Sequence, residues 1–323
     1  MRLIQFEDRA GQRRVGVVEG AGIQVLRGVR STRETGAGGD SRGQRPARRG
    51  AAPRQRSQAR TMPGCWRREG CCRRWIADDP AHCLVSGTGL THLGSAATRD
   101  RMHQQNQGDE TALTDTMRIF RWGLEGGKPP AGQVGAQPEW FYKGDGGIVV
   151  RPGADFPLPA FAEDAGEEPE LVGLYLIGDD RRPYRLGYAL GNEFSDHLME
   201  RRNYLYLAHS KLRACCYGPE LRVGELPRHL QGESRILRDG EVLWQQAFLS
   251  GEDNMCHSLE NLEYHHFKYA QFLRPGDVHV HYFGTATLSF ADGIKAAPGM
   301  SSRSPWPSSA RRCAMASPPS RPH

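Results

Sequence analysis

Three glutamates in this 323-residue chain are spaced so that their carboxylates could act together. Glu168 and Glu170 stand two residues apart at the start of an apolar run, 171–177, which predicts a buried strand. Side chains two apart on a strand point to the same face, so these carboxylates should lie side by side. Glu193 follows a second apolar run, 186–190, and the stretch between the two runs predicts a turn. Two neighbouring strands would therefore bring three carboxylates together.

Such a group of carboxylates repels itself unless a cation lies among them. Three hard oxygen donors, with no His or Cys at ligand spacing, suit Mg²⁺ or Mn²⁺, whereas zinc prefers nitrogen or sulfur. The spacing also fits an ordinary acidic turn, because Glu163, Asp164 and Glu167 make this stretch acidic in any case. The spacing alone leaves both interpretations open.

Four motifs in a fixed order extend this pattern along the chain. They are Glu168-Pro169-Glu170, Gly191-Asn192-Glu193, Ser210-Lys211, and Gly276-Asp277 leading to Gly284-Thr285. In this order they resemble the motifs of the fumarylacetoacetate hydrolase superfamily, and the resemblance covers about residues 80 to 298. Within the superfamily, the amino-acid sequences of residues 191–197 and 283–287 are most similar to those of a sugar-acid branch that includes 2-keto-3-deoxyarabonate dehydratases.

The resemblance implies an α+β, β-rich fold, which is a mixed β-roll or distorted barrel with flanking helices and a small N-terminal domain. We therefore expect a small N-terminal domain over residues 1–110, a catalytic β-roll domain over 111–298, and a tail over 299–323. Apolar residues near helical spacing predict a flanking helix over 258–273. Relatives of this kind commonly form homodimers, so a homodimer is expected.

The resemblance also implies roles for residues outside the carboxylate group. Lys211 would point into the pocket near the metal, where burial and the cation depress its pKa enough for proton transfer. Lys143 would face the pocket as a cation that binds a substrate carboxylate, although without the resemblance a solvated lysine fits equally well. We accordingly expect Lys211, Lys143 and Thr285 to be catalytic. We expect His92, Ser195 and Gly284 to bind substrate, and Glu168, Glu170 and Glu193 to bind the metal.

The chain departs from the motifs of the superfamily at several positions. Ser95 stands where the hydrolases often carry a lid histidine that, paired with a glutamate, activates water for C–C cleavage. The absence of this histidine weakens the prediction that the protein is a hydrolase. Glu193 replaces the usual Asp and is one methylene longer, so Asp196 could serve as the ligand instead. His197 stands where many relatives have Arg.

The implied site suits the chemistry of a small-molecule 2-keto acid. Such an acid offers a carboxylate and an adjacent carbonyl that can chelate one Mg²⁺, which stabilises the enolate formed when a base removes a C3 proton. A hydroxyl on C4 can then leave, whereas a carbonyl at C4 allows water to cleave the C–C bond. We expect dehydration of a 3-deoxy sugar acid by a metal-dependent lyase. Hydrolysis of an acylpyruvate and non-catalytic binding of a sugar acid are the alternatives.

Two segments differ in composition from the rest of the chain. Residues 33–75 contain no Leu, Val, Ile, Phe or Tyr and 12 of them are Arg, while residues 299–323 are similarly poor in aliphatics. Such segments cannot bury enough apolar surface to fold, so we expect extended, poorly packed chain. We interpret both as out-of-frame translation of a G/C-rich gene, because G/C-rich codons encode Gly, Ala, Arg and Pro. Basic arms that bind RNA or a membrane are the alternative.

These two segments also carry the basic charge of the chain. The first has a net charge of +9 and the second +4, so the remainder is −7 although the whole chain is +6. The basic balance is therefore no evidence for a nucleic-acid partner. The mean hydropathy of -0.62, the absence of a long apolar run and the polar start predict neither a membrane span nor a signal peptide. We expect a cytoplasmic protein without nucleic-acid or membrane partners.

Overall fold

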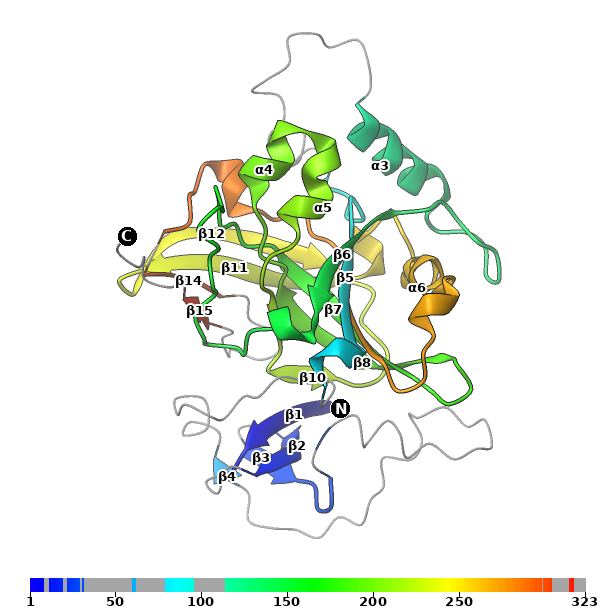
Figure 1. The fold of residues 1–323 in the computed structure, drawn as a ribbon, viewed down its shortest axis with the longest axis vertical. Coiled ribbons are helices and arrows are strands. Elements are labelled where there is room, and N and C mark those ends of the chain that lie inside the picture. Colours follow the sequence, from blue (N-terminus) through cyan, green and yellow to red (C-terminus); the bar gives the residue numbers. More distant parts are fainter. Residues whose placement is uncertain are drawn as a thin grey trace.

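The strands of this protein form two sheets with short helices around them (Figure 1). The computed structural model describes residues 1–8, 12–19, 22–29, 31, 60–61, 79–95, 114–297, 299–303 and 314–316. The larger sheet has 11 strands and the smaller has 4, so the expected α+β, β-rich class is confirmed. Within these ranges, no helix is long and apolar enough to cross a membrane.

Five strands form the middle of the larger sheet, in the order β8-β7-β13-β5-β6. Their bounds are β5 (Cys83–Gly89), β6 (Glu139–Asp145), β7 (Pro169–Ile177), β8 (Pro183–Asn192) and β13 (Val278–Tyr282). β13 pairs in parallel with β5 and antiparallel with β7, which places segments far apart in the sequence side by side. Cys83 and Val85 of β5 pack in the same core cluster as β7 and β13, while the predicted boundary of the N-terminal domain at residue 110 stays a prediction.

The central sheet is buried on both faces. Along β7, Val172 and Leu174 belong to one core cluster, whereas Leu171 and Tyr175 belong to another on the opposite face. This alternation is the period-2 geometry of a strand, and it explains why the run is apolar at every position. Glu170 lies on the same face of β7 as Val172, so its side chain is buried in the interior of the fold.

The N-terminal strands extend the larger sheet at one edge. β1 (Arg2–Glu7), β2 (Arg13–Glu19), β3 (Gly22–Val25) and β4 (Arg60–Thr61) follow one another antiparallel. β1 joins the central strands through β10 (Glu220–Arg222), which pairs with β8, as does the short β9 (Cys216–Tyr217). In Figure 1 these N-terminal strands lie apart from the helices, at the bottom of the molecule.

The smaller sheet includes two strands from residues 299–323, the segment that is poor in aliphatic residues. It consists of β11 (Leu230–Arg238), β12 (Glu241–Ser250), β14 (Met300–Arg303) and β15 (Ala314–Ala316). β14 pairs with β11, and the buried Met300 packs against Ile236 and Trp244. The expectation of poorly packed chain after residue 299 is therefore wrong for β14, because one buried methionine and backbone pairing hold it. The same expectation for 33–75 lies outside the described residues except at β4.

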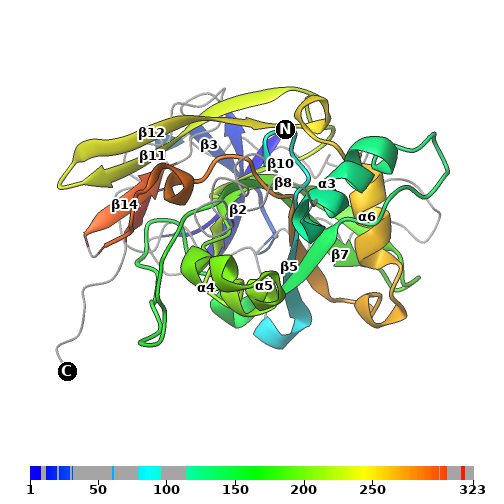
Figure 2. The same ribbon diagram turned by 90° about the horizontal axis from the view of Figure 1, so that it is seen from above.

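Short helices flank the sheets. They are α3 (Asp115–Gly126), α4 (His197–Arg202), α5 (Leu207–Ser210) and α6 (Leu259–Phe267), with 3-10 turns at Pro80–His82, Gly146–Ile148, Tyr204–Tyr206, Glu252–Asn254, Ala270–Phe272 and Ser289–Asp292. Ser258 caps α6 through the Asn261 amide, as a serine at an N-cap does. The predicted helix over 258–273 is shorter than expected, because a break at residues 268–269 separates α6 from a 3-10 turn. In Figure 2, α3 and α6 lie on one side and the β11–β12 hairpin on the other.

Candidate active site

Three buried carboxylates meet where β7 begins and β8 ends. The register sets Glu170 opposite Gly191, so Glu193, one residue beyond β8, lies beside Glu168. The Glu193 amide donates to the Glu168 carbonyl at 3.0 Å. One carboxylate oxygen from each of Glu168, Glu170 and Glu193 lies within 4.8 Å of the others. The three side chains therefore converge as the strand spacing predicts, and their role as metal ligands stays a prediction.

The charges of these carboxylates are unequally compensated. Burial and then the charges of Glu193 and Glu168 raise the pKa of Glu170 well above its ordinary value. Its Oε2 accepts a hydrogen bond of 2.7 Å from the Gly284 amide. Burial alone would raise the pKa of Glu168, but Lys211 and His197 outweigh it and hold that pKa well below its ordinary value. Burial also raises the pKa of Glu193, so of the three carboxyls only that of Glu168 has a lowered pKa, and that of Glu170 is raised well above its ordinary value.

This donor set fits a hard divalent cation. It offers three carboxylates and no thiolate, which matches the ligand preference of Mg²⁺ or Mn²⁺. A dication among them would also oppose the repulsion that raises the pKa of Glu170. Asp196 does not join the group. Its carboxylate accepts from Arg213 at 2.8 Å and caps α4 through the Met199 amide, which corrects the suggestion that it could replace Glu193.

Lys211 follows α5, and its ammonium group lies between two of the glutamates. Nζ donates to Glu168 Oε1, to Glu193 Oε2 at 2.6 Å, and to Ser195 Oγ at 3.0 Å. Burial alone would lower the pKa of Lys211, but the charges of Glu168 and Glu193 outweigh it and raise that pKa. In this arrangement of charges the pKa of Lys211 is therefore raised, opposite to the direction expected beside a metal ion, and its catalytic role stays a prediction.

Lys143 lies behind the carboxylates and does not face the pocket. Its side chain is fully buried and donates to Glu193 Oε1. It also donates to three carbonyl oxygens, those of Glu193 at 2.9 Å, Phe194 at 2.7 Å and Lys211 at 2.9 Å. These acceptors occupy all of its protons and give no support to the predicted binding of a substrate carboxylate, which stays a prediction. Lys143 instead ties the turn after β8 to the end of α5.

Gly284 and Thr285 leave β13 beside the carboxylates. Gly284 has φ +87°, and a Cβ there would lie 2.4 Å from Thr91 Oγ1 and 2.8 Å from the Thr88 carbonyl, so both conformation and space require glycine. Its amide donates to Glu170 and its backbone lines the cavity beside the carboxylates, so its predicted contact with substrate stays a prediction. Thr285 lines the cavity, and its Oγ1 accepts from the Thr287 amide at 3.1 Å, leaving its hydroxyl hydrogen to donate.

His92 and Ser195, the other predicted substrate contacts, support the site from behind. His92 Nε2 lies 3.0 Å from Ser250 Oγ and its Nδ1 3.0 Å from Thr91 Oγ1, and burial lowers its pKa to about 3. Ser195 Oγ donates to Glu193 Oε2 at 2.9 Å. Neither side chain lines the cavity beside the carboxylates. Their polar atoms have protein partners that support the site, and their predicted contact with substrate stays a prediction.

The cavity beside the carboxylates is small, about 20 Å³. Its walls combine polar and apolar side chains, namely Thr88, Ser95, His197, Glu200, Leu90, Phe141 and Leu288. A ligand the size of a sugar acid therefore fits only after side chains around it move. A larger cavity of about 1050 Å³ is lined partly by residues 147–151, but it contains none of the three glutamates and offers no comparable chemistry.

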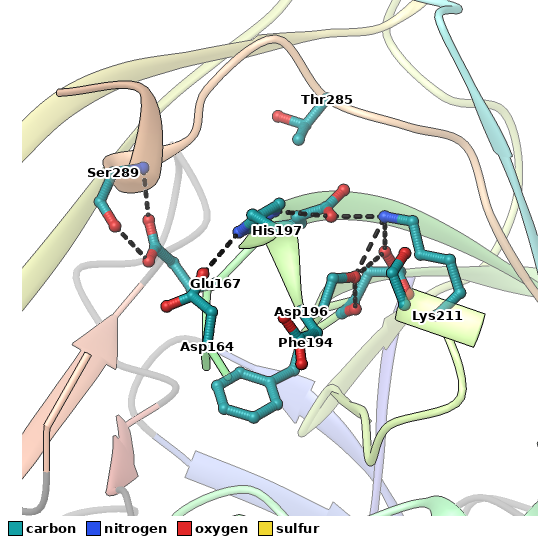
Figure 3. Close-up of polar contacts among 12 residues, drawn as sticks. Asp164, Glu167, Phe194, Asp196, His197, Lys211, Thr285 and Ser289 are labelled. Atoms are coloured by element: carbon teal, nitrogen blue, oxygen red, sulfur yellow. Dashed lines mark hydrogen bonds and ion pairs between the residues drawn. The ribbon is translucent and has the colours of Figure 1, made fainter. Parts of the chain in front are cut away.

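Two histidine contacts and one carboxylate contact were missed by the sequence reasoning. His197 Nε2 lies 3.0 Å from Glu168 Oε1 and its Nδ1 lies 3.5 Å from Asp164 Oδ2. Glu167 accepts from both the amide and the hydroxyl of Ser289, at 2.9 Å and 2.5 Å. Figure 3 shows His197 between this contact and Lys211. The only sequence signal was that His197 departs from the residue of many relatives.

The chain is similar to known dehydratases in part of its sequence and in its fold. The chain is 35% identical over 121 residues to the "Probable 2-keto-3-deoxyxylonate dehydratase" of Haloferax volcanii, a match that covers 36% of this chain and 40% of that relative. A structure of 2-keto-3-deoxy-D-arabinonate dehydratase complexed with magnesium and 2,5-dioxopentanoate superposes with a TM-score of 0.72 and 16% identity, and covers both chains fully. The predicted resemblance is confirmed. No family model matches the chain.

A second group of solved structures shares the fold more distantly. The 5-carboxymethyl-2-hydroxymuconate delta-isomerase of Mycobacterium smegmatis has a TM-score of 0.56 and 15% identity over 98% of each chain. Dehydratases and isomerases thus occur on this fold, and identities of this size establish the fold alone. The reaction has to be argued from the site itself.

Proposed function

We propose that this protein is a divalent-metal-dependent hydro-lyase that removes water from a 2-keto-3-deoxy sugar acid. The observation that carries the proposal is the buried group of Glu168, Glu170 and Glu193 with the Lys211 ammonium against two of them. The names of the Haloferax relative and of the magnesium-containing dehydratase structure support the same reaction class.

The three glutamates would hold Mg²⁺ or Mn²⁺ at the base of the cavity. A cation held there would polarise the 2-keto oxygen as a Lewis acid and so make the C3 proton more acidic. Burial of all three carboxylates excludes water and strengthens each electrostatic interaction. Lys143 and Ser195 keep Glu193 in place during the reaction, because they bind its two oxygens.

Two of the chain's own groups would move the protons. Lys211 Nζ takes the C3 proton, since it lines the cavity and its pKa falls through burial once Glu168 and Glu193 no longer supply its counter-charges. The C4 hydroxyl leaves as water after gaining a proton. Glu200, a buried carboxyl on α4 that lines the same cavity, is our candidate donor. One proton and one hydroxide leave the substrate, which balances as one water.

Ser95 separates this proposal from acylpyruvate hydrolysis. Its Oγ donates to the Thr285 carbonyl at 3.1 Å and accepts from the His92 amide at 3.2 Å, so it is held as part of the wall. A serine in this position cannot act as the water-activating histidine that the resemblance associates with C–C hydrolases. Dehydration therefore fits the cavity wall better than hydrolysis.

The test is to identify the product. Purified protein with Mg²⁺ is incubated with 2-keto-3-deoxy-D-arabinonate and, separately, with an acylpyruvate, and both are followed by NMR and mass spectrometry. We expect loss of one water from the first and no pyruvate from the second, with activity lost on chelation. Pyruvate release would favour the hydrolase, and binding of the sugar acid without any product would favour a non-catalytic binding protein.

We also propose that the enzyme is a cytoplasmic homodimer, as the resemblance implies. Light scattering on the purified protein should give about twice the chain mass of 35.9 kDa. A mass equal to that of one chain would reject the dimer.

A further inference from the structure

His197 is the first residue of α4, and three segments of the chain meet at its ring. The ring is 1% exposed. The segment before β7 closes over one side of it, because a Cβ on Gly166 would lie 2.0 Å from His197 Nδ1. The Phe290 ring lies 5.0 Å away between centroids. The imidazole is thus packed closely between these segments.

The two ring nitrogens face different carboxylates. Nε2 lies 3.0 Å from Glu168 Oε1, within hydrogen-bond distance, while Nδ1 lies 3.5 Å from Asp164 Oδ2. Lys211 Nζ donates to the same Glu168 Oε1. Two donors therefore engage one oxygen of Glu168, and its Oε2 accepts neither of these hydrogen bonds. Both donors thus engage Oε1 and leave Oε2 to other partners.

We propose that His197 is a positioning residue that makes Glu168 a one-oxygen ligand by holding Oε1 through Nε2–H. This inference rests on the proposed metal centre and adds which atom of Glu168 binds the ion. Groups that orient a ligating carboxylate typically change metal affinity 10–100-fold when they are removed. Without this hydrogen bond Glu168 can rotate about its side chain, and binding the ion must then order it.

The competing explanation is that His197 anchors Asp164 and acts only on stability. Glutamine and asparagine separate the two, because the Gln amide nitrogen reaches the place of Nε2 whereas the Asn amide nitrogen reaches the place of Nδ1. His197→Gln keeps a donor to Glu168 and His197→Asn keeps one to Asp164. His281→Gln is the matched control, since His281 is also buried and its Nδ1 bonds to Ser86 Oγ at 2.9 Å, outside the cavity walls.

The experiment titrates Mn²⁺ into the full-length protein and its variants, by calorimetry and by the electron paramagnetic resonance signal of free Mn²⁺. We expect His197→Gln and His281→Gln to bind within about threefold of the wild type, and His197→Asn to bind about 10–100-fold more weakly. Circular dichroism before each titration verifies folding. If His197→Asn does not fold, a His197→Gln variant with weakened binding overturns the proposal and one with wild-type binding supports it.

The other outcomes separate this proposal from the metal centre itself. Equal affinities of the Gln and Asn variants, or a weaker Gln variant, overturn the role of His197 while leaving the metal centre intact. A wild-type protein that binds no Mn²⁺, or a Glu168→Gln variant that binds as tightly as the wild type, overturns the metal centre and this inference with it.

Discussion

Replacing Lys143 with methionine should destabilise the protein strongly, although sequence reasoning placed this lysine in the substrate pocket. The substitution keeps an unbranched side chain that is one atom shorter and removes the donor to the Glu193 carboxylate and to three backbone carbonyls. Both partners of this ion pair are completely buried. Removing one partner of a buried pair costs about 3–5 kcal/mol when the other charge is left uncompensated, and because Lys211 still compensates part of the Glu193 charge, we expect the lower end of this range. That is a large part of a typical stability of about 5–15 kcal/mol.

Urea denaturation followed by circular dichroism measures this loss. The control is Lys268→Met, whose exposed ammonium bonds to Gln137 Oε1 at 2.8 Å and whose removal should change stability by less than about 0.5 kcal/mol. Adding Glu193→Gln to Lys143→Met should recover part of the loss, because the uncompensated charge disappears. A Lys143→Met protein of wild-type stability with a raised KM would refute the reasoning and return Lys143 to the pocket.

Three further predictions concern the ionisable groups of the cavity. Lys211→Met should lower turnover about 10²–10⁴-fold while Mn²⁺ still binds, and wild-type turnover would remove Lys211 from proton transfer. Glu200→Gln should lower kcat about 10²-fold with Mn²⁺ affinity unchanged in calorimetry; an unchanged kcat would exclude Glu200 as the proton donor. In protein freed of metal by a chelator, the raised pKa of Glu170 contributes to the free energy of unfolding. This contribution is complete below the ordinary pKa of 4.5 and decreases as the pH rises toward the pKa of the folded state. Thermal unfolding at pH 6 and pH 8 should therefore show a loss that Glu170→Gln reduces, and an identical loss in both proteins would contradict the shift.

The convergence of the three glutamates could be predicted from the sequence, because local rules determine it. Glu168 and Glu170 share a strand face by period-2 geometry, and the short connection from β7 to β8 brings Glu193 beside them. The order of the motifs then predicted the fold class and the position of Lys211. The three glutamates and Lys211 lie within a few tens of residues of one another, whereas the fold class was inferred from motifs spread over more than a hundred residues.

What the sequence could not supply depends on contacts between distant segments. The acceptors of Lys143 come from residues 193, 194 and 211, so its burial is invisible until the chain is folded. β14 was missed because its composition is poor in aliphatics, whereas pairing with β11 and burial of Met300 hold it. The capping role of Asp196 could have been foreseen, since an Asp directly before a helical stretch is a common N-cap signal.

The most direct test of the account is to locate the ion by anomalous diffraction from crystals of the full-length protein grown with Mn²⁺. We predict one strong peak bounded by Glu168, Glu170 and Glu193, at about 2.0–2.2 Å from one oxygen of each, close to the Mg²⁺–oxygen distance. A crystal that holds Mn²⁺ elsewhere, or shows no peak among these three carboxylates, would contradict the central claim.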